Sequence, residues 1–233
     1  MTKFYFLIIS IAISSLLRCE IVPDWVFRIP SESNIKYAVG VSDKYLEEAK
    51  ALENSFDMAC YELACQKKAS IQAKSLDVVG SNYVFFETVL PDSSDVIFYK
   101  KTAKRIAHYS DSRYTYLLIA TDSVKITTNL IKIHKDDLRK LKDTCFEEND
   151  NVTGFGSSNY ISALGFLYAA NRAKVNICEQ ISNNVMSITE DENFRTAITN
   201  KSETKLTLYG LRISGYYVDY KTNIITAFAE YDK

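Results

Sequence analysis

The side chains of this sequence most able to carry nucleophilic, acid–base or metal chemistry are its two histidines and five cysteines. His108 lies in a strand-like stretch and His134 in a charged one, so both are expected to be surface or turn residues. The sequence contains no H-E-x-x-H, G-x-S-x-G or P-loop pattern. Gly154-Phe155-Gly156 is too short for a dinucleotide-binding loop and lacks its third glycine. These observations predict a protein that is not an enzyme and has no catalytic residue, cofactor or metal site.

Four cysteines follow the N-terminal one, and two interpretations of them stay open. Cys60 and Cys65 lie on a predicted helix, about 140° apart around its axis, so they cannot readily bridge each other or face one metal. In an oxidising compartment two disulfides could form, in any of three pairings. The interpretation we favour is that the cysteines are buried as small apolar residues. The four are Cys60, Cys65, Cys145 and Cys178.

The N-terminus carries the clearest signal of the sequence. Lys3 supplies a positive charge, the run from Phe4 to Leu17 is uncharged and mostly apolar, and Arg18 ends it just before Cys19. A membrane-spanning helix needs about 20 apolar residues, so this shorter run fits the hydrophobic region of a secretory signal peptide better. An uncleaved anchor helix is the alternative. No later segment is long and apolar enough to cross a membrane, so the rest of the chain is expected to be soluble.

Leu16-Leu17-Arg18-Cys19 resembles a lipobox, the leucine-x-x-cysteine signal at which a diacylglyceryl group is transferred to a cysteine thiol. The resemblance implies that residues 1–18 are the signal peptide and that Cys19 is the site of lipid attachment. Arg18 departs from the pattern, because the residue before the cysteine is usually small, and it leaves open whether lipoprotein processing proceeds. Ordinary cleavage near Ser14 or Ser15 is the alternative.

Composition indicates a globular protein. Of the 233 residues, 47% are hydrophobic and 24% are charged, while only 7 are Gly and 3 are Pro, which excludes disordered and collagen-like classes. The 28 basic and 29 acidic side chains give a net charge of -1, which argues against a nucleic-acid-binding protein. The 16 Tyr and 12 Phe residues favour β-sheets.

The first half reads as a strand, a long helix and several strands. Tyr37–Val41 is expected to be a strand, and apolar residues at every third or fourth position predict a helix from about Ser42 to about Ile71. A charged helix is expected over Lys132–Thr144 and a loop over Glu147–Asn151. Further strands are expected at Tyr83–Val89, Val96–Lys101, Arg105–Tyr109 and Tyr114–Thr121.

The second half repeats this order. A glycine-bearing stretch at Asn151–Gly156 precedes a second helix, and strands follow at Lys205–Ser214 and Ile224–Tyr231, with a turn at Asp219–Asn223. The apolar stripe of the helix is expected to comprise Ile161, Leu164, Leu167, Ala170, Ala173, Ile177, Ile181 and Val185. The predicted fold is α+β, with two tandem strand–long helix–antiparallel sheet units and the helix packed on one sheet face. The expected domains are residues 19–147 and 148–233, with a single mixed domain as the alternative.

Several short motifs together resemble the bacterial LPP-twenty family of twenty-kilodalton envelope lipoproteins. They are Pro23-x-Trp25-Val26 after the lipid cysteine, Tyr37-Ala38-Val39-Gly40-Val41-Ser42, the alanine-rich helix that follows and the apolar strand Tyr116–Ala120. The resemblance covers residues 19 to about 121, and a degenerate second copy would cover about 152 to 231. It implies a small α+β domain without catalytic residues, of a kind that also occurs in flagellar accessory proteins of the outer membrane and periplasm.

The sequence therefore favours a non-catalytic, membrane-anchored envelope lipoprotein, placed in the outer membrane and facing the periplasm or the cell surface. Its expected partners are membrane lipid, through the anchor at Cys19, and envelope proteins or further copies of itself, in an envelope or flagellar accessory assembly. No nucleic-acid partner is expected.

Two alternatives belong to other functional classes. A periplasmic small-ligand-binding protein would have a deep apolar pocket with convergent polar groups, placed between the two repeats. An enzyme that uses His108 or a cysteine would have a histidine beside a thiol or a carboxylate.

Overall fold

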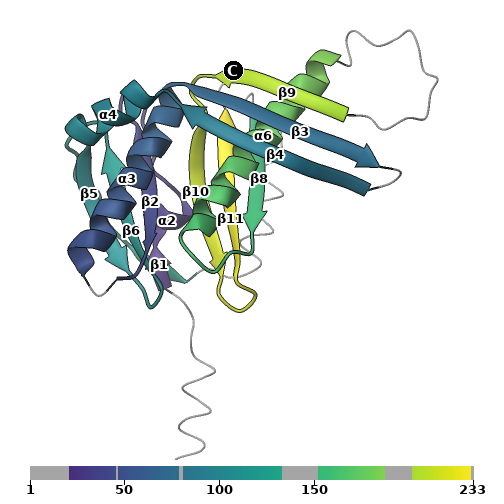
Figure 1. Cartoon of the computed structure of the whole chain (residues 1–233). Coiled ribbons are helices and arrows are strands. Elements are labelled where there is room, and N and C mark those ends of the chain that lie inside the picture. The colour runs from purple at the N-terminus through teal and green to yellow at the C-terminus, as the bar shows by residue number, and fades with distance from the viewer. Residues whose placement is uncertain (1–20, 46, 79–80, 133–151, 187–200, 232–233) are drawn as a thin grey trace, which may run out of the picture.

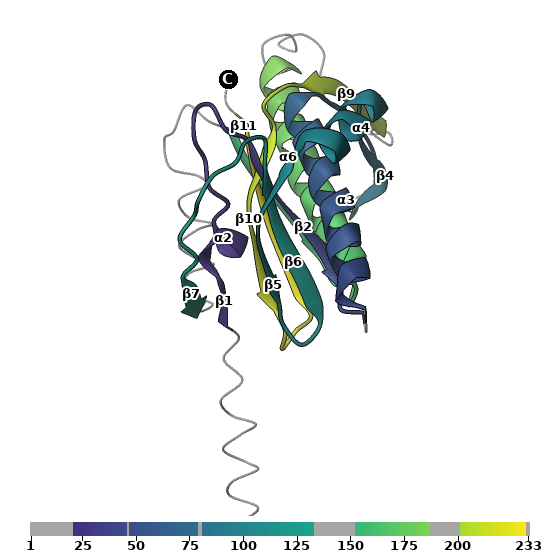
Figure 2. The ribbon, with the colours of Figure 1, turned by 90° about the vertical axis from the view of Figure 1, so that its left-hand side faces the viewer.

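The computed structural model describes residues 21–45, 47–78, 81–132, 152–186 and 201–231. These residues form three layers, which are seen edge-on in Figure 2. Two long helices make one outer layer, two three-stranded antiparallel sheets make the middle layer, and a short N-terminal segment lies on the opposite face of the sheets.

The first sheet and its helix come from the first half of the chain. The sheet has the order β2-β6-β5, with β2 at Tyr37–Asp43, β6 at Tyr114–Ala120 and β5 at Lys104–Ser110. The helix α3 (Glu48–Lys67) packs on β2 and β6. All seven residues of β6 are buried, because both faces of this central strand are covered.

The second half builds the same arrangement. Its sheet has the order β10-β11-β8, with β10 at Arg212–Asp219, β11 at Ile224–Tyr231 and β8 at Val152–Ser158. The helix α6 (Leu164–Met186) packs on β8 and β11. The prediction of an α+β fold, with a helix packed on one face of an antiparallel sheet in each half, is confirmed.

A glycine in the first strand of each unit lets the helix approach the sheet closely. A Cβ atom on Gly40 of β2 would lie 1.8 Å from the backbone oxygen of Ser55 in α3. A Cβ atom on Gly156 of β8 would lie 2.3 Å from the backbone oxygen of Ala169 in α6. The glycine-bearing stretches that were predicted to correspond in the two halves therefore serve the same packing function in both units.

A third sheet joins the two halves. Its order is β4-β3-β9, with β3 at Ala69–Val78, β4 at Ser81–Pro91 and β9 at Lys201–Leu208, and it forms an arm that extends from the body (Figure 1). β3 follows α3 and β9 follows α6, and these two strands pair antiparallel from Ala69↔Leu208 to Leu76↔Lys201. The largest hydrophobic core also contains residues of both halves. The boundary predicted between residues 147 and 148 lies outside the described residues.

The N-terminal layer consists of β1 (Ile21–Pro23), the short helix α2 (Asp24–Phe27) and β7 (Leu130–Lys132). β1 pairs antiparallel with β7, so residues 130–132 lie beside residues 21–23. α2 packs on β10 of the second unit and β6 of the first. The segment thus covers the seam between the two sheets on the face that the helices leave open (Figure 2).

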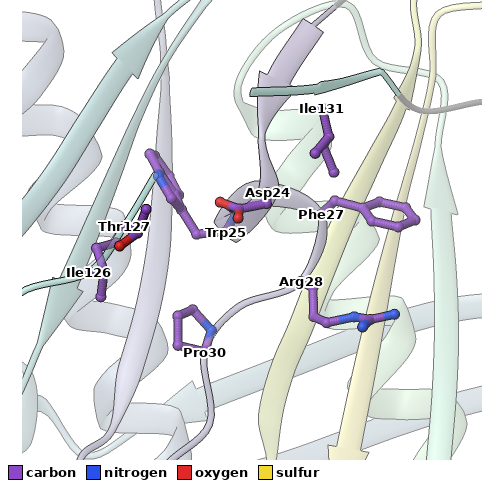
Figure 3. Close-up of a pocket in the computed structure, with 8 residues that line it drawn as sticks. All are labelled: Asp24, Trp25, Phe27, Arg28, Pro30, Ile126, Thr127 and Ile131. Atoms are coloured by element: carbon purple, nitrogen blue, oxygen red, sulfur yellow. Dashed lines mark hydrogen bonds between the residues drawn. The ribbon is translucent and has the colours of Figure 1, made fainter. Parts of the chain in front are cut away.

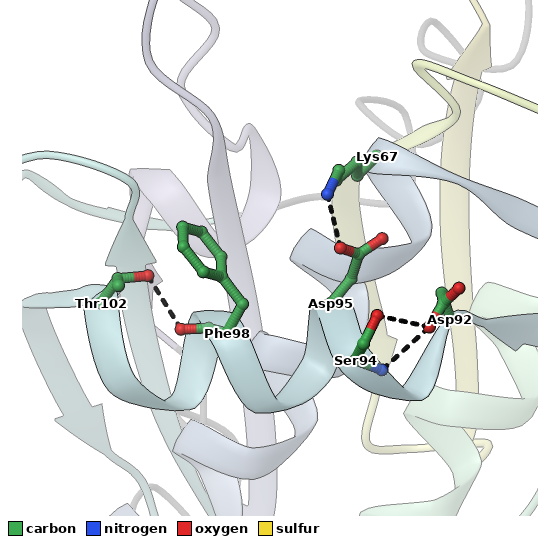
Figure 4. Close-up of polar contacts among 6 residues, drawn as sticks. All are labelled: Lys67, Asp92, Ser94, Asp95, Phe98 and Thr102. Atoms are coloured by element: carbon green, nitrogen blue, oxygen red, sulfur yellow. Dashed lines mark hydrogen bonds and ion pairs between the residues drawn. The ribbon is translucent and has the colours of Figure 1, made fainter.

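Three local predictions are wrong. Val96–Lys101 is not a strand but belongs to the helix α4 (Ser93–Thr102), whose N-cap residue Asp92 accepts a hydrogen bond from the backbone N–H of Ser94 at 2.9 Å (Figure 4). α3 begins at Glu48 rather than near Ser42, because β2 runs to Asp43, and it ends at Lys67 rather than near Ile71, because β3 begins at Ala69. The single strand predicted over Lys205–Ser214 is two strands, separated by a turn in which Gly210 has a φ of 82°.

The start of α6 also differs from the prediction. The helix begins at Leu164, and its buried residues near this end include Phe166, Ala169 and Ala170. Ile161 and Leu164, the first two residues of the predicted stripe, are 65% and 58% exposed. These two side chains are therefore not part of the core. The helix predicted over Lys132–Thr144 lies, apart from its first residue, outside the described residues.

Candidate functional site

The predicted lipid-attachment residue, Cys19, lies two positions before the folded body. Cys19 itself is outside the described residues, and β1 begins at Ile21. The side chains of Trp25 and Val26 are each only 2% exposed and belong to the main core. The chain therefore enters the core within six residues of Cys19, without a long linker between them.

Hydrogen bonds fix this N-terminal segment on both sides. The Asp24 carboxylate accepts from the side-chain amide of Asn129 at 2.8 Å and from the backbone N–H of Trp25 at 2.9 Å. The backbone N–H of Ile29 donates to the carbonyl of Ser214 in β10 at 2.8 Å. A Cβ atom on Gly215 would lie 1.9 Å from the carbonyl oxygen of Phe27, so glycine at this position lets the segment lie against β10.

An open pocket of about 420 Å³ lies beside the segment (Figure 3). Its lining combines α2 and the residues after it with the stretch that leads into β7. The lining residues are Asp24, Trp25, Phe27, Arg28, Pro30, Ile126, Thr127 and Ile131. A second pocket of about 330 Å³ shares Phe27, Arg28 and Pro30 with the first and reaches β10 and β11.

The charged residues that line these two pockets are Asp24, Arg28, Arg212 and Glu230, and the Asp24 carboxylate already accepts a hydrogen bond from Asn129. Arg212 forms an ion pair with Glu230 across β10 and β11. Within the described part of the chain, the exposed guanidinium of Arg28 has no acidic partner. Mostly apolar walls with one unpaired cation suit an apolar ligand that carries an anionic group.

Loops from both units meet at one end of the molecule, which we call the turn end. It comprises the turn at residues 110–113, the turn at 219–223, the end of β2 and the connection between β8 and α6, and it is at the bottom in Figure 1. Arg113 donates to the side chain of Asn223 at 2.7 Å, and the Asp43 carboxylate accepts from the backbone N–H of Ala163 at 2.8 Å. Both contacts join the first unit to the second.

Asp111 is the centre of the polar contacts at the turn end. Its carboxylate accepts hydrogen bonds from the hydroxyls of Tyr220 and Tyr116, and from the backbone N–H groups of Arg113 and Tyr114 at 2.6 and 2.7 Å. Burial raises the pKa of Tyr116 well above its usual value, and the neighbouring Tyr220 and Asp111 raise it further. The hydroxyl therefore stays protonated and can donate to the carboxylate.

A second polar cluster lies in the interior, between the helices. Lys174 Nζ of α6 lies 2.6 Å from Glu62 Oε2 of α3, and both side chains are almost fully buried. Burial lowers the pKa of Lys174, but the adjacent Cys65 and Glu62 outweigh it and give a raised pKa, so the ammonium stays charged. Among the described residues of this cluster, Glu62 Oε1, Lys174 Nζ and the buried hydroxyl of Tyr216 have no hydrogen-bond partner, so the contact between Lys174 and Glu62 is an ion pair.

The cysteines that the structure describes are buried thiols. Cys60 and Cys65 in α3 and Cys178 in α6 are free, and Cys145 lies outside the described residues. Burial is the main cause that raises the pKa of Cys60 and of Cys65 to about 12, and that of Cys178 to about 11. These three thiols are therefore protonated and poorly nucleophilic at neutral pH.

His108, the histidine that the structure describes, does not line either pocket. His108 Nε2 of β5 lies 3.7 Å from Glu48 Oε1 of α3, and both side chains are more than half exposed. His134 is outside the described residues. No group of three His, Cys, Asp or Glu side chains within the described ranges could hold a metal ion. In the same ranges, no helix combines the length and the apolar character that crossing a membrane requires.

Far from the turn end, α4 presents apolar side chains to solvent. Lys67 of α3 donates to the carboxylate of Asp95 at 2.5 Å, and this contact holds the start of α4 against α3 (Figure 4). Ile97 and Phe98 are each 54% exposed. Ile97 and Phe98 are therefore exposed to a similar degree as Ile161 and Leu164 near the start of α6.

Comparisons with families, with curated proteins and with solved structures give no match to this chain.

Sequence reasoning predicted Cys19 as the lipid-attachment residue, which lies outside the described residues, and it singled out the motif around Trp25, which the structure places at the seam between the sheets. It missed the pair of Glu62 and Lys174, which are 112 positions apart in the printed sequence, and it missed the pocket at Arg28. A charged residue within each apolar helix was the signal available for the pair. No local pattern marked the pocket, because it forms where two segments distant in sequence, residues 24–30 and 126–131, meet.

Proposed function

We propose that this protein is a non-catalytic envelope lipoprotein that is anchored through Cys19 and acts as a structural or protein-interaction module. The observation that carries the proposal is the position of Cys19, directly after the apolar N-terminal run and two residues before β1. A mature chain that starts at Cys19 keeps every described residue, including the buried Trp25 and Val26. The motifs that resemble the LPP-twenty family support the same assignment.

The chemistry of the described residues supports a function without catalysis. The buried thiols have raised pKa values, which disfavours the thiolate that a nucleophile requires. The pair of His108 and Glu48 places a histidine near a carboxylate, but on an exposed surface and 3.7 Å apart. An enzyme would need a more enclosed arrangement to exclude water and position a substrate.

The arm is the part that we expect to bind protein partners. Among the described strands, β4 pairs only with β3, so one edge of this 11-residue strand is open. An open edge presents backbone N–H and C=O groups to which a strand of a partner can pair. A photoreactive amino acid at the exposed Leu90 of β4 should crosslink to an envelope protein, whereas one at the exposed Lys101 of α4 should not. Equal crosslinking at both positions would contradict strand pairing.

Replacement of the anchor cysteine tests the proposal as a whole. Cys19→Ser should abolish labelling by a fatty-acid probe and release the protein from membranes. Cys145→Ser is the matched control, since it also removes one thiol but should leave the labelling intact. Labelling that persists in Cys19→Ser would contradict the proposal.

The pocket supports a second candidate, a protein that binds an amphipathic anionic ligand. The supporting observation is the apolar pocket of about 420 Å³ beside the unpaired Arg28. Calorimetric titration with palmitate, below its micelle-forming concentration, should show saturable binding that Arg28→Gln weakens. Absence of saturable binding to the parent protein would exclude this ligand.

A further inference from the structure

We propose that the turn end of the folded body lies on the lipid bilayer, with Tyr160, Ile161 and Leu164 in contact with phospholipid. This inference rests on the proposed anchor at Cys19 and adds an orientation and a contact surface to it. We call Tyr160, Ile161, Leu164 and Ile224 the apolar end patch.

The first step is the length of the tether. Two residue steps separate Cys19 from Ile21, and at about 3.8 Å for each step they span no more than about 8 Å. A diacylglyceryl group on Cys19 is buried in the bilayer. Ile21 is therefore held close to the membrane surface, and whichever end of the body carries Ile21 must face the lipid.

The second step places Ile21 at the turn end. The hydroxyl of Tyr109 donates to the backbone carbonyl of Ile21 at 2.9 Å, and Tyr109 directly precedes the turn at residues 110–113. That turn contacts Asn223 of the other unit through Arg113. In both views of the ribbon, β1 starts at the same end as the β5–β6 and β10–β11 turns (Figures 1 and 2).

The third step is the chemistry of this end. The members of the apolar end patch are 40–65% exposed, although they are large apolar side chains. Tyr160 stacks on Tyr168 with ring centroids 4.9 Å apart, which holds its ring on the outer surface of α6. Because Asp43 accepts from the N–H of Ala163, the loop that carries Tyr160 and Ile161 is tied to the first unit at this end. Tyrosine and aliphatic side chains are favourable at the membrane interface.

The charges of the turn end are compatible with a lipid surface. Lys44, Arg113 and Lys221 are exposed, whereas the acidic side chains of the same loops are only partly exposed and accept hydrogen bonds. Those acids are Asp43, Asp111 and Asp219. Glu47 and Glu48 at the start of α3 are exposed and oppose the three bases. Apolar contact is therefore the main attraction, and the bases add affinity for anionic lipids.

Fluorescence quenching by lipid tests this orientation. The full-length lipoprotein would be expressed, processed by its host, purified in detergent and reconstituted into vesicles of phosphatidylethanolamine and phosphatidylglycerol, with or without bromine on the acyl chains. The chain has 1 Trp, and it is buried, so an introduced indole adds an exposed reporter to a constant background. Ile161→Trp places the reporter in the patch, and Phe98→Trp places it at the exposed face of α4 as the matched control. Leu164→Trp replaces Ile161→Trp if that variant fails to fold.

Three outcomes are distinguishable. Loss of the introduced indole fluorescence with brominated lipid for Ile161→Trp, but not for Phe98→Trp, supports the proposal. Vesicles that carry the protein on flotation without quenching of Ile161→Trp overturn the orientation and leave the lipoprotein function standing. Protein that lacks an acyl group by mass spectrometry and does not float with vesicles overturns both.

Discussion

Lys174 Nζ of α6 lies 2.6 Å from Glu62 Oε2 of α3, and the two side chains are 0% and 3% exposed. This ion pair joins the helices of the two units inside the core. Desolvation of two charges is costly, and their mutual attraction offsets it only when both partners are present. We therefore predict that the pair helps to specify how the two units dock.

Replacement of one member of the Glu62–Lys174 pair should therefore lower the stability of the protein. Lys174→Met leaves the Glu62 carboxylate buried without a counter-charge and should lower the free energy of unfolding by about 3–5 kcal/mol. Urea denaturation followed by circular dichroism measures the change. Lys100→Met is the matched control, because Lys100 pairs with Asp57 at 2.7 Å on the surface, and its loss should cost less than about 1 kcal/mol. Equal effects of the two substitutions would contradict the structural importance of the buried pair.

The close helix–sheet contacts at Gly40 and Gly156 should not tolerate a methyl group. Gly40→Ala and Gly156→Ala place a Cβ atom 1.8 and 2.3 Å from helix carbonyl oxygens, so α3 or α6 must move away from its sheet. Each variant should lose roughly 1–3 kcal/mol of stability, as in other overpacked cores. Thermal unfolding of both variants checks this. A gain in stability, as expected where alanine only restricts the unfolded chain, would show that the contacts are not this close.

Stability should fall in alkaline solution because of the buried thiols. The pKa of Cys60 and of Cys65 is raised from 9.0 to about 12, and that of Cys178 from 9.0 to about 11. Above pH 9 the unfolded chain releases thiol protons that the native state retains, so the free energy of unfolding decreases as pH rises. Buried tyrosines with raised pKa values, such as Tyr116, act in the same direction at higher pH.

Thiol reactivity provides the measurement for this prediction. With Cys19→Ser and Cys145→Ser together as the background, a thiol reagent should label Cys60, Cys65 and Cys178 only as the protein unfolds. Denaturation midpoints should decline between pH 9 and pH 11, and Cys60→Ala should flatten the decline. Rapid labelling of the native protein at neutral pH would mean that the thiols are accessible.

The N-terminal segment should contribute to the core rather than lie loosely on it. Trp25→Ala removes a side chain that is 2% exposed at the seam between the sheets and should cost roughly 3–5 kcal/mol. Phe98→Ala, at a position that is 54% exposed, should change stability by no more than about 0.5 kcal/mol. Chemical denaturation of the two variants separates these cases. A small effect of Trp25→Ala on the free energy of unfolding would contradict a rigid attachment of the N-terminal segment to the body.

The repeated features of the fold were predictable because each has a local signature. Glycine in an apolar stretch before an amphipathic helix indicated both β2–α3 and β8–α6, and the turn at Asp219–Asn223 is found between β10 and β11. Short segments whose composition fits both a strand and a helix were harder to predict. Val96–Lys101 has the apolar and aromatic content of a strand, but Asp92 caps a helix there, and the lysines near its end, Lys100 and Lys101, favour the same helix.

Features that depend on long-range pairing could not be predicted. β9 pairs with β3, its counterpart in the other unit, so the two halves exchange strand contacts although each has its own sheet. The pair of Glu62 and Lys174 depends on how the two helices approach each other, and no periodic pattern encodes that. The exposure of Ile161 and Leu164 was missed for a similar reason, because apolar spacing predicts a helix face without showing what covers it.

The mass of the N-terminal peptide of the mature protein tests the central claim most directly. The protein would be purified from envelopes and digested, and its N-terminal peptide would be analysed by mass spectrometry. The proposed function predicts a peptide that begins at Cys19 and carries a diacylglyceryl group on its thiol. An unmodified peptide that begins near Ser14 or Ser15, or one that retains residues 1–18, would contradict it.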